Sequence, residues 1–351
     1  MTDLTETLEW LVNIPSETGG EGRIATAIAE RLLPIWTLQG VQRIGNSLVV
    51  GQRTDRPLIS LYGHIDTVPE QNENGRARID DGRMHGLGTA DMKSGVAVMI
   101  HLLEDEEVRS GDFDVVGVFY DREEGRADEN GLEEVLQRAS WLVQSEFALV
   151  LEPTDLNIEV GCNGTMNADV IFKGRAAHSA RPWLGDNAVT KAGEWFTELH
   201  RMEPRSEMID ELEYHEVFTV TKAGGGVANN VVPAEFTVNL NYRFPPSMTV
   251  DDARTRLAEV AGPADEVIVR DFAPAGKIPE ANKHLLRFES LLGGRRLPKQ
   301  GWTDVARLGE YGIPAVNYGP GDPTEAHQAG ESVALANLNV ANSVLRHFLG
   351  A

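Results

Sequence analysis

Cysteine is almost absent from this sequence. Cys162 is the only one among 351 residues, which excludes an intramolecular disulfide and a cysteine-cluster zinc site. No apolar run approaches the roughly 20 residues that a membrane-spanning helix needs. The first residues contain neither the basic region nor the apolar core of a secretory signal. We therefore expect a cytoplasmic protein without a membrane-spanning segment.

Basic residues are also few compared with acidic ones. The chain has 54 Asp and Glu against 32 Lys and Arg, a formal net charge of −22. A field of that sign repels phosphate backbones and anionic lipid surfaces, which argues against a nucleic-acid or membrane partner. It does not exclude an acidic small substrate, because a bound metal ion can invert the field locally.

The pattern of apolar residues predicts a large α/β domain with a mostly parallel sheet. Short apolar runs alternate with stretches of helical periodicity, as expected for strands that helices cover on both faces. The apolar runs lie at 47–50, 58–62, 115–120, 147–151 and 315–318. The helical stretches include 95–106, 132–143 and 333–348.

The middle of the chain has a different pattern. Residues 166–172 and 236–244 alternate apolar and polar side chains, which is typical of strands with one solvated face. Helices are expected nearby at 187–200 and 250–260. We therefore predict a smaller α+β domain inserted into the large one. The expected division is 1–165 and 276–351 for the large domain and 166–275 for the insertion.

Histidines and carboxylates follow the predicted strands of the large domain, where open α/β sheets place ligand sites. His64 and Asp66 follow the run at 58–62. Because they are two positions apart in extended chain, their side chains point the same way, and Asp66 can support the orientation of a metal-bound His64. Taken alone, the pair is more simply a polar turn after a strand.

Glu123 and Glu124 follow the run at 115–120. Adjacent side chains in extended chain face opposite ways, so one of them can bind a metal ion while the other addresses bound water. Without the rest of the pattern, they are a solvated loop in an acidic protein.

Three further residues complete the candidate set. Asp91 lies in a glycine-rich turn before a predicted helix, where a helix cap is an equally good interpretation. Glu152 directly follows the run at 147–151, and His327 lies in the loop after 315–318. Two histidines with three carboxylates suit two zinc ions, and an aspartate is suited to bridge metals roughly 3.5–4 Å apart.

Five segments, in order, resemble a known family. They are GHIDTVP at 63–69, GTADMKSG at 88–95, DREEG at 121–125, LEPT at 151–154 and the loop with His327. Together they resemble the zinc-dependent exopeptidases and deacylases, a family that includes succinyl-diaminopimelate desuccinylase, acetylornithine deacetylase, carboxypeptidase G and aminoacylase. The resemblance covers nearly the whole chain, and five ordered matches are far more specific than any single one.

This resemblance implies two Zn²⁺ ions, for which Co²⁺ is expected to be able to substitute. It makes His64 and Glu152 the terminal ligands of one ion. Glu124 and His327 are then the terminal ligands of the other, and Asp91 bridges both.

The resemblance also implies two roles beside the ligands. Asp66 is expected to hydrogen-bond His64 from outside the ligand set. Glu123 is expected to be the general base that takes a proton from the bridging water and hands it to the leaving amine.

The inserted domain has its own matches. GRAAHSARP at 174–182 resembles the family's lid motif, whose histidine reaches the active site of the partner subunit. His178 would then help to stabilise the tetrahedral oxyanion across a homodimer. Asn230 resembles the asparagine of the lid loop, and Arg243 the arginine that binds a substrate carboxylate. Without the resemblance, His178 is a surface loop histidine.

The expected activity is hydrolysis of an amide in a small N-acyl amino acid. Within the family, EPT at 152–154 and GCNG at 161–164 look most like the desuccinylases that release succinate from N-succinyl-LL-2,6-diaminopimelate. Acetylornithine deacetylase, or another N-acyl amino acid hydrolase or carboxypeptidase, is the alternative. An alternative from another class is a non-catalytic dimeric binding protein, which the complete set of ligand positions argues against.

Overall fold

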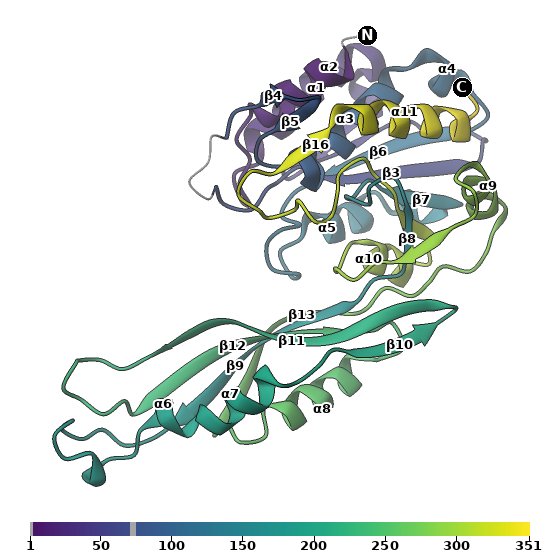
Figure 1. Ribbon diagram of the computed structural model, residues 1–351. Coiled ribbons are helices and arrows are strands. Elements are labelled where there is room, and N and C mark those ends of the chain that lie inside the picture. Colours follow the sequence, from purple (N-terminus) through teal and green to yellow (C-terminus); the bar gives the residue numbers. More distant parts are fainter. Residues whose placement is uncertain (1–2, 71–74) are drawn as a thin grey trace. The chain divides into compact units, whose positions relative to one another are not determined.

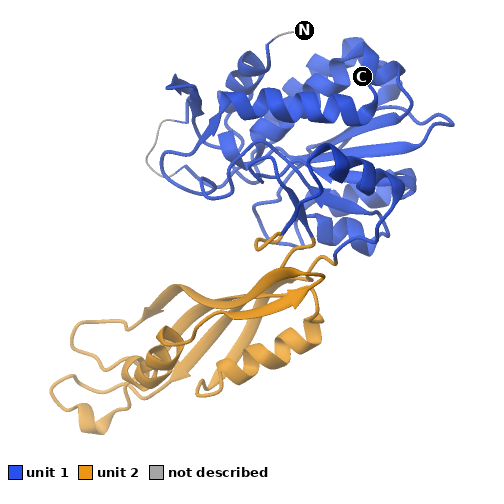
Figure 2. Ribbon diagram, turned by 45° about the vertical axis from the view of Figure 1, so that its right-hand side comes forward, with its two compact units in different colours: residues 1–160, 278–297, 303–351 blue, residues 161–277, 298–302 orange. Residues whose placement is uncertain are grey.

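The computed structural model describes residues 3–70 and 75–351, which form two compact units (Figures 1 and 2). Unit 1 consists of Met1–Val160, Ile278–Leu297 and Thr303–Ala351. Unit 2 consists of Gly161–Lys277 and Pro298–Trp302. The chain therefore changes unit at 160/161 and 277/278, where the sequence placed boundaries at 165/166 and 275/276. The return of 298–302 to unit 2 was not predicted.

The described part of unit 1 is built around an eight-stranded sheet in the order β1-β2-β6-β3-β7-β15-β8-β14. The strands are β1 (Val41–Ile44), β2 (Ser47–Val50), β3 (Leu58–His64), β6 (Asp114–Tyr120), β7 (Phe147–Val150), β8 (Ile158–Val160), β14 (Arg296–Pro298) and β15 (Ala315–Asn317). The central strands β6, β3, β7 and β15 are parallel, whereas β1, β2 and β8 pair antiparallel. The predicted α/β class is confirmed; the sheet is mixed, with parallel strands at its centre and antiparallel pairs on either side.

Helices lie on both faces of this sheet (Figure 1). One group consists of α1 (Leu4–Val12), α2 (Gly22–Gly40), α3 (Ser94–Glu104) and α11 (Leu335–Leu349), which pack against one another. The other helices of unit 1 are α4 (Glu106–Ser110), α5 (Gly131–Arg138), α9 (Lys283–Leu291) and α10 (Val305–Glu310), with a short turn η2 (Ser140–Gln144). Every residue of β3 and β6 is buried, as this covering requires.

A close approach between α3 and β7 sets the position of the turn before α3. A Cβ added at Gly95 would collide with the backbone oxygen of Leu151, just past the end of β7. Glycine at this position therefore lets the first turn of α3, and the turn η1 (Thr89–Lys93) ahead of it, lie against the strand end. A small sheet of β4 (Arg78–Asp80), β5 (Arg83–His85) and β16 (Ser332–Ala334) adjoins this turn.

Unit 2 is an antiparallel sheet with helices, as the alternating pattern predicts. The strand order is β10-β11-β12-β9-β13. The strands are β9 (Gly164–Lys173), β10 (Arg205–Ile209), β11 (Leu212–Gly225), β12 (Glu235–Phe244) and β13 (Glu266–Ala273). The helices are α6 (Ala188–Lys191), α7 (Gly193–His200) and α8 (Val250–Val260), with a short turn η3 (Pro182–Leu184). Alternate residues of β12, such as Val238 and Leu240, are buried in one cluster with Trp195 of α7 and Leu257 of α8.

The helix expected at 187–200 is interrupted. Asn187 caps α6 by accepting the backbone N–H groups of Val189 and Thr190, and α6 ends at Lys191. Ala192 separates it from α7. No helix in the described residues is long and apolar enough to cross a membrane.

Candidate metal centre

Four neighbouring parallel strands of unit 1 lead into the predicted ligands. The residues are His64 at the end of β3, Glu124 after β6, Glu152 after β7 and His327 after β15. Because the sheet order is β6-β3-β7-β15, the carboxyl ends of these strands open at one edge of the sheet. Asp91 reaches the same place from η1, which precedes α3.

Asp91 lies between the two histidines. Its Oδ1 is 3.1 Å from His64 Nε2, and its Oδ2 is 3.5 Å from His327 Nε2. Each oxygen of this carboxylate therefore faces a different imidazole. A carboxylate so placed is suited to bridge two metal ions.

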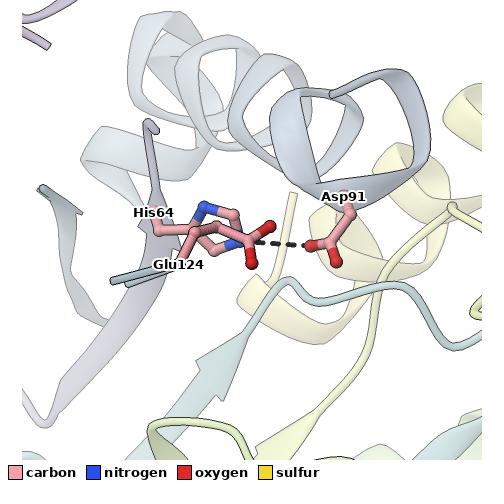
Figure 3. Close-up of side chains that lie close together, drawn as sticks. All are labelled: His64, Asp91 and Glu124. Carbon is pink, nitrogen blue, oxygen red and sulfur yellow. Dashed lines mark hydrogen bonds and ion pairs between the residues drawn. The ribbon is translucent and has the colours of Figure 1, made fainter. Parts of the chain in front are cut away.

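Two glutamates occupy the ends of the same row. Glu152 Oε1 is 3.8 Å from His64 Nε2, and Glu124 Oε1 is 2.9 Å from His327 Nε2. Figure 3 shows His64, Asp91 and Glu124, whose potential ligand atoms all lie within 4.8 Å of one another. The structure thus brings together all five residues that the sequence proposed as ligands. We call them the ligand row; each half has one histidine and one glutamate around the shared Asp91.

The ligand row and the adjacent Glu123 gather more carboxyl groups than imidazoles. Four carboxyl groups meet there, those of Asp91, Glu123, Glu124 and Glu152, beside two imidazoles. Burial raises the pKa of Glu123 well above its ordinary value; His64 opposes this shift and Glu152 adds to it. Hydrogen bonds to Asp91 and Glu124 raise the pKa of His327 to about 11. This buried cluster of carboxyl oxygens and imidazole nitrogens is a donor set that fits divalent cations such as Zn²⁺.

Asp66 makes more contacts than the sequence suggested. Its carboxylate is fully buried and accepts the backbone N–H groups of Glu123 and Glu124, at 3.0 and 3.1 Å, and the Thr18 hydroxyl at 2.9 Å. The His64 Nδ1 lies 3.1 Å from the Asp66 backbone oxygen and 3.6 Å from its Oδ1. One buried residue therefore positions both the His64 ring and the peptide segment that carries Glu123 and Glu124.

Two residues at the site have left-handed backbone conformations although neither is glycine. Arg122, directly before Glu123, has a φ of 60°, and His327 has a φ of 58°. Such a conformation typically costs about 1–3 kcal/mol and persists where the surrounding structure imposes it, often at functional sites. The strained residues therefore lie in two loops, one carrying Glu124 and the other carrying His327, and these two side chains contact each other.

Two buried charged residues, Lys93 and Glu331, were not assigned a role by any sequence pattern. Lys93, at the end of η1, donates hydrogen bonds from Nζ to the backbone oxygens of Leu11 and Ile14, at 3.2 and 2.9 Å. Burial lowers the pKa of Lys93 to about 8. It ties η1 to the end of α1, and only the fold brings those segments together.

A cavity of about 660 Å³ in unit 1 opens beside the ligand row. Its lining includes His327 from the row and Val68, His85, Leu87 and Gln328 from the surrounding loops. A small molecule in this cavity would lie next to a predicted metal ligand.

In unit 2, His178 and Asn230 lie on two adjoining loops. The backbone N–H of Ser179 donates to the backbone oxygen of Asn230 at 2.9 Å, and His178 pairs with Val231 in a short antiparallel bridge. The His178 Nδ1 accepts the backbone N–H of Ala180 at 3.1 Å. His178 and Asn230 are both exposed.

Arg243 lies at the other end of β12. It is eight positions beyond Glu235, the first residue of that strand, whereas Asn230 precedes the strand. At about 3.3 Å per residue, those eight positions span roughly 26 Å. The Arg243 Nε donates to Asn241 Oδ1 at 3.1 Å. Unit 2 therefore brings His178 and Asn230 together but not Arg243.

An α/β unit with candidate ligands at the ends of parallel strands, interrupted by an α+β unit, is the arrangement expected of a metallohydrolase. The chain belongs to peptidase family M20/M25/M40, whose model matches residues 60–351. The family resemblance based on the five sequence segments is confirmed.

Relatives of this chain match nearly its whole length. It is 38% identical over 342 residues to a Mycobacterium tuberculosis protein with the provisional name succinyl-diaminopimelate desuccinylase DapE, covering 97% of this chain and 96% of that protein. It is 36% identical over 355 residues to the succinyl-diaminopimelate desuccinylase of Corynebacterium glutamicum, covering 97% and 94%.

Solved structures share the fold at lower identity. A tripeptidase from Staphylococcus aureus has a TM-score of 0.78 at 23% identity, covering 99% of this chain and 96% of that one. A metallo-carboxypeptidase of the M20 family from Sulfolobus solfataricus has a TM-score of 0.78 at 15% identity, covering 99% of each chain.

Proposed function

We propose that this chain is a two-zinc amide hydrolase that removes succinate from N-succinyl-LL-2,6-diaminopimelate, in cytoplasmic lysine and diaminopimelate biosynthesis. The observation that carries the hydrolase assignment is the ligand row, with Asp91 between two histidines and Glu123 beside it. The choice of substrate is supported by the desuccinylase names of relatives at 36–38% identity over nearly the whole chain.

The residues of unit 1 divide the chemistry between them. His64, Asp91 and His327, with the glutamates at the two ends of the row, would hold two ions. When bound, such ions polarise the amide carbonyl and lower the pKa of a water molecule. Glu123, buried near His64 and Glu152, would take the proton from the attacking water and donate it to the leaving amine. The Asp66 carboxylate keeps Glu123 in place by accepting the backbone N–H of Glu123.

We propose further that the enzyme is a homodimer in which His178 completes the partner's site. The support is the separation inside unit 2, where roughly 26 Å of β12 lies between the end near His178 and Arg243. That distance is longer than a small acyl amino acid, so one substrate molecule does not reach both residues within one chain. His178 would donate to the oxyanion, and Asn230 on the adjoining loop would contact the same substrate.

Arg243 is proposed to bind a substrate carboxylate. A succinylated diaminopimelate carries several carboxylates, which a chain of net charge −22 repels at long range. Local positive charge is therefore needed, and a guanidinium offers a bidentate fork to a planar carboxylate.

A substrate panel tests the proposed activity. The metal-stripped protein is reloaded with zinc and assayed with N-succinyl-LL-2,6-diaminopimelate, N-acetylornithine and other N-acyl amino acids. We expect the highest kcat/KM for the succinylated substrate. Without metal, we expect no hydrolysis of any substrate. A higher kcat/KM for N-acetylornithine would instead assign the acetylornithine deacetylase activity, which a Myxococcus xanthus relative at 29% identity is named for. Zinc uptake without hydrolysis of any of these amides would favour a binding protein.

A further inference from the structure

Glu331 is a buried carboxylate outside the ligand row. It is 4% exposed and lies four residues after His327, directly before β16. Its oxygens accept three backbone N–H groups: that of Gly88 on Oε2 at 2.7 Å, and those of Ala90 and Asp91 on Oε1 at 2.7 and 2.9 Å. One side chain therefore holds the turn that carries Asp91.

The conformation of this turn explains why it needs an acceptor. Gly88 has a left-handed backbone with a φ of 80°, and Asp91 has the extended values φ −123° and ψ 98° in place of helical ones. Backbone N–H groups in such a turn are not all used by a regular helix, and buried N–H groups need partners. The Glu331 carboxylate is the hydrogen-bond acceptor for three of these N–H groups.

The same residue joins two members of the ligand row. Its backbone oxygen accepts the N–H of Gly86 at 3.1 Å, and the next residue, Ser332, pairs with His85 across β16 and β5. The segment that carries His327 is thereby attached, through main chain and side chain, to the turn that carries Asp91. Asp91 and His327 are neighbours in the ligand row, with 3.5 Å between Asp91 Oδ2 and His327 Nε2.

We infer that Glu331 is a positioning residue for the metal centre, which holds Asp91 and His327 at the separation that a shared ion requires. This inference rests on the metal centre of the proposed function, but not on the identity of the amide that is cleaved. Glu331 contacts the backbone of Asp91 and is not itself one of the proposed ligands. Its expected effect is therefore on metal affinity, in the range of 10–100-fold that partners of metal ligands typically contribute.

The substitution Glu331→Gln tests this role. Glutamine keeps the length of the side chain but replaces one acceptor oxygen with an NH₂ group, which faces a backbone N–H and cannot accept it. Zinc affinity is measured on the metal-stripped protein by competition with a chromophoric chelator, without substrate. We expect an affinity about 10–100-fold below that of wild type. The matched control is Glu325→Gln on the same segment, whose carboxylate contacts Arg83 and Ser332 instead of the turn.

A purely structural role predicts something different. It would lower the denaturant concentration at which the metal-free protein unfolds and leave the zinc affinity of the folded fraction at the wild-type value. That result would overturn the inference. Should Glu331→Gln fail to fold, Glu331→Asp decides the same question: it keeps both oxygens but shortens their reach, and wild-type zinc affinity in this variant would likewise overturn the inference. A Glu331→Gln variant with weakened zinc binding supports it even if the wild type prefers another amide.

Discussion

Glu123 and Glu124 are adjacent in the chain but have different neighbours. Burial raises the pKa of both carboxyls, but the Glu124 carboxylate contacts His327 at 2.9 Å, whereas Glu123 lies in the field of His64 and Glu152. Both are held by the same Asp66 carboxylate through their backbone N–H groups. These different surroundings are the reason that we assign a ligand role to Glu124 and a proton-transfer role to Glu123 in the proposed mechanism.

We predict that Glu123→Gln keeps its zinc and its fold but loses at least about 100-fold in kcat, because general-base catalysis typically contributes 10²–10⁴-fold. Zinc content by elemental analysis and kcat with a saturating amide substrate check this. The comparison variant is Glu124→Gln, which should lose zinc as well as activity. A zinc-replete Glu123→Gln enzyme with near wild-type turnover would disprove the assignment.

At the same scale, we predict that Arg243→Lys lowers kcat/KM by at least about 1.5 kcal/mol, roughly tenfold, because lysine cannot reproduce a bidentate fork to a carboxylate. Zinc content should not change. If Arg243 only supports β12 through Asn241, the variant should instead have unaltered kcat/KM and a lower melting temperature. Kinetics and a melting curve on the same preparation distinguish the two roles.

How well single residues can be predicted depends on where their partners lie in the sequence. The five ligand candidates were found because each lies near a recognisable strand end or in a recognisable turn. The contacts of Asp66 with Glu123 and of Glu331 with Gly88 span 57 and 243 positions. No local sequence pattern predicts contacts between such distant positions. The contacts of Asp66 with Glu123 and of Glu331 with Gly88 are therefore seen only in the folded chain.

At the scale of elements, prediction succeeded where local signals agree. Helix α8 begins at Val250 as expected, because Thr249 and Asp252 form a reciprocal capping box ahead of an amphipathic run. The strands β4 and β10 were missed because they are short and mostly exposed and so present no buried apolar run. The helix at 187–200 was expected to be continuous, but it is divided at Ala192.

The cap of α8 gives a stability prediction for unit 2. Thr249→Ala removes the side-chain acceptor for the Asp252 N–H and should destabilise the protein by about 1 kcal/mol. Urea unfolding followed by circular dichroism measures this. The same substitution inside the helix, Thr255→Ala, should be neutral or stabilising, because alanine is the better helix former. Equal losses from both variants would contradict the capping role.

The contact between α1 and α3 predicts a pH dependence. His101 of α3 is buried and hydrogen-bonds Thr7 of α1 at 2.9 Å, and burial lowers the pKa of His101 below its ordinary value of 6.5. The unfolded chain therefore binds a proton at this position at a pH where the folded chain does not, so stability falls as the pH drops through about 6.5. In His101→Gln this contribution is absent.

Chemical denaturation of metal-free wild type and His101→Gln, at several pH values between 7.5 and 5.5, checks this. We expect the unfolding free energy of the variant to decline less steeply on acidification. Removing the metal from both proteins eliminates the linkage between metal binding and pH. The titration of the candidate ligands themselves is common to both curves, so the difference between the curves reports on His101. Parallel curves for the two proteins would show that His101 does not contribute.

At the scale of the whole molecule, the proposed exchange of His178 between subunits can be tested by mixing inactive variants. Glu123→Gln and His178→Ala are each expected to be inactive alone. In a mixed dimer, the His178→Ala subunit keeps its own Glu123 and receives an intact His178 from its partner. Random exchange in a twofold-symmetric dimer should therefore restore about a quarter of the wild-type activity. Mixed dimers verified by mass but without activity would place His178 in its own subunit's site, whereas an active His178→Ala enzyme on its own would place this residue outside the mechanism.

The order of the strands in unit 1 also has a consequence for biosynthesis. Strand β15, which lies between β7 and β8, comes from the last part of the chain, together with His327 and Glu331. During translation, all of unit 2 leaves the ribosome before β15 does. The edge of β7 therefore stays open on the nascent chain while unit 2 is already complete, and an open strand edge is a site for mispairing. The metal centre can be assembled only near the end of synthesis, so a truncated chain cannot form the complete ligand row.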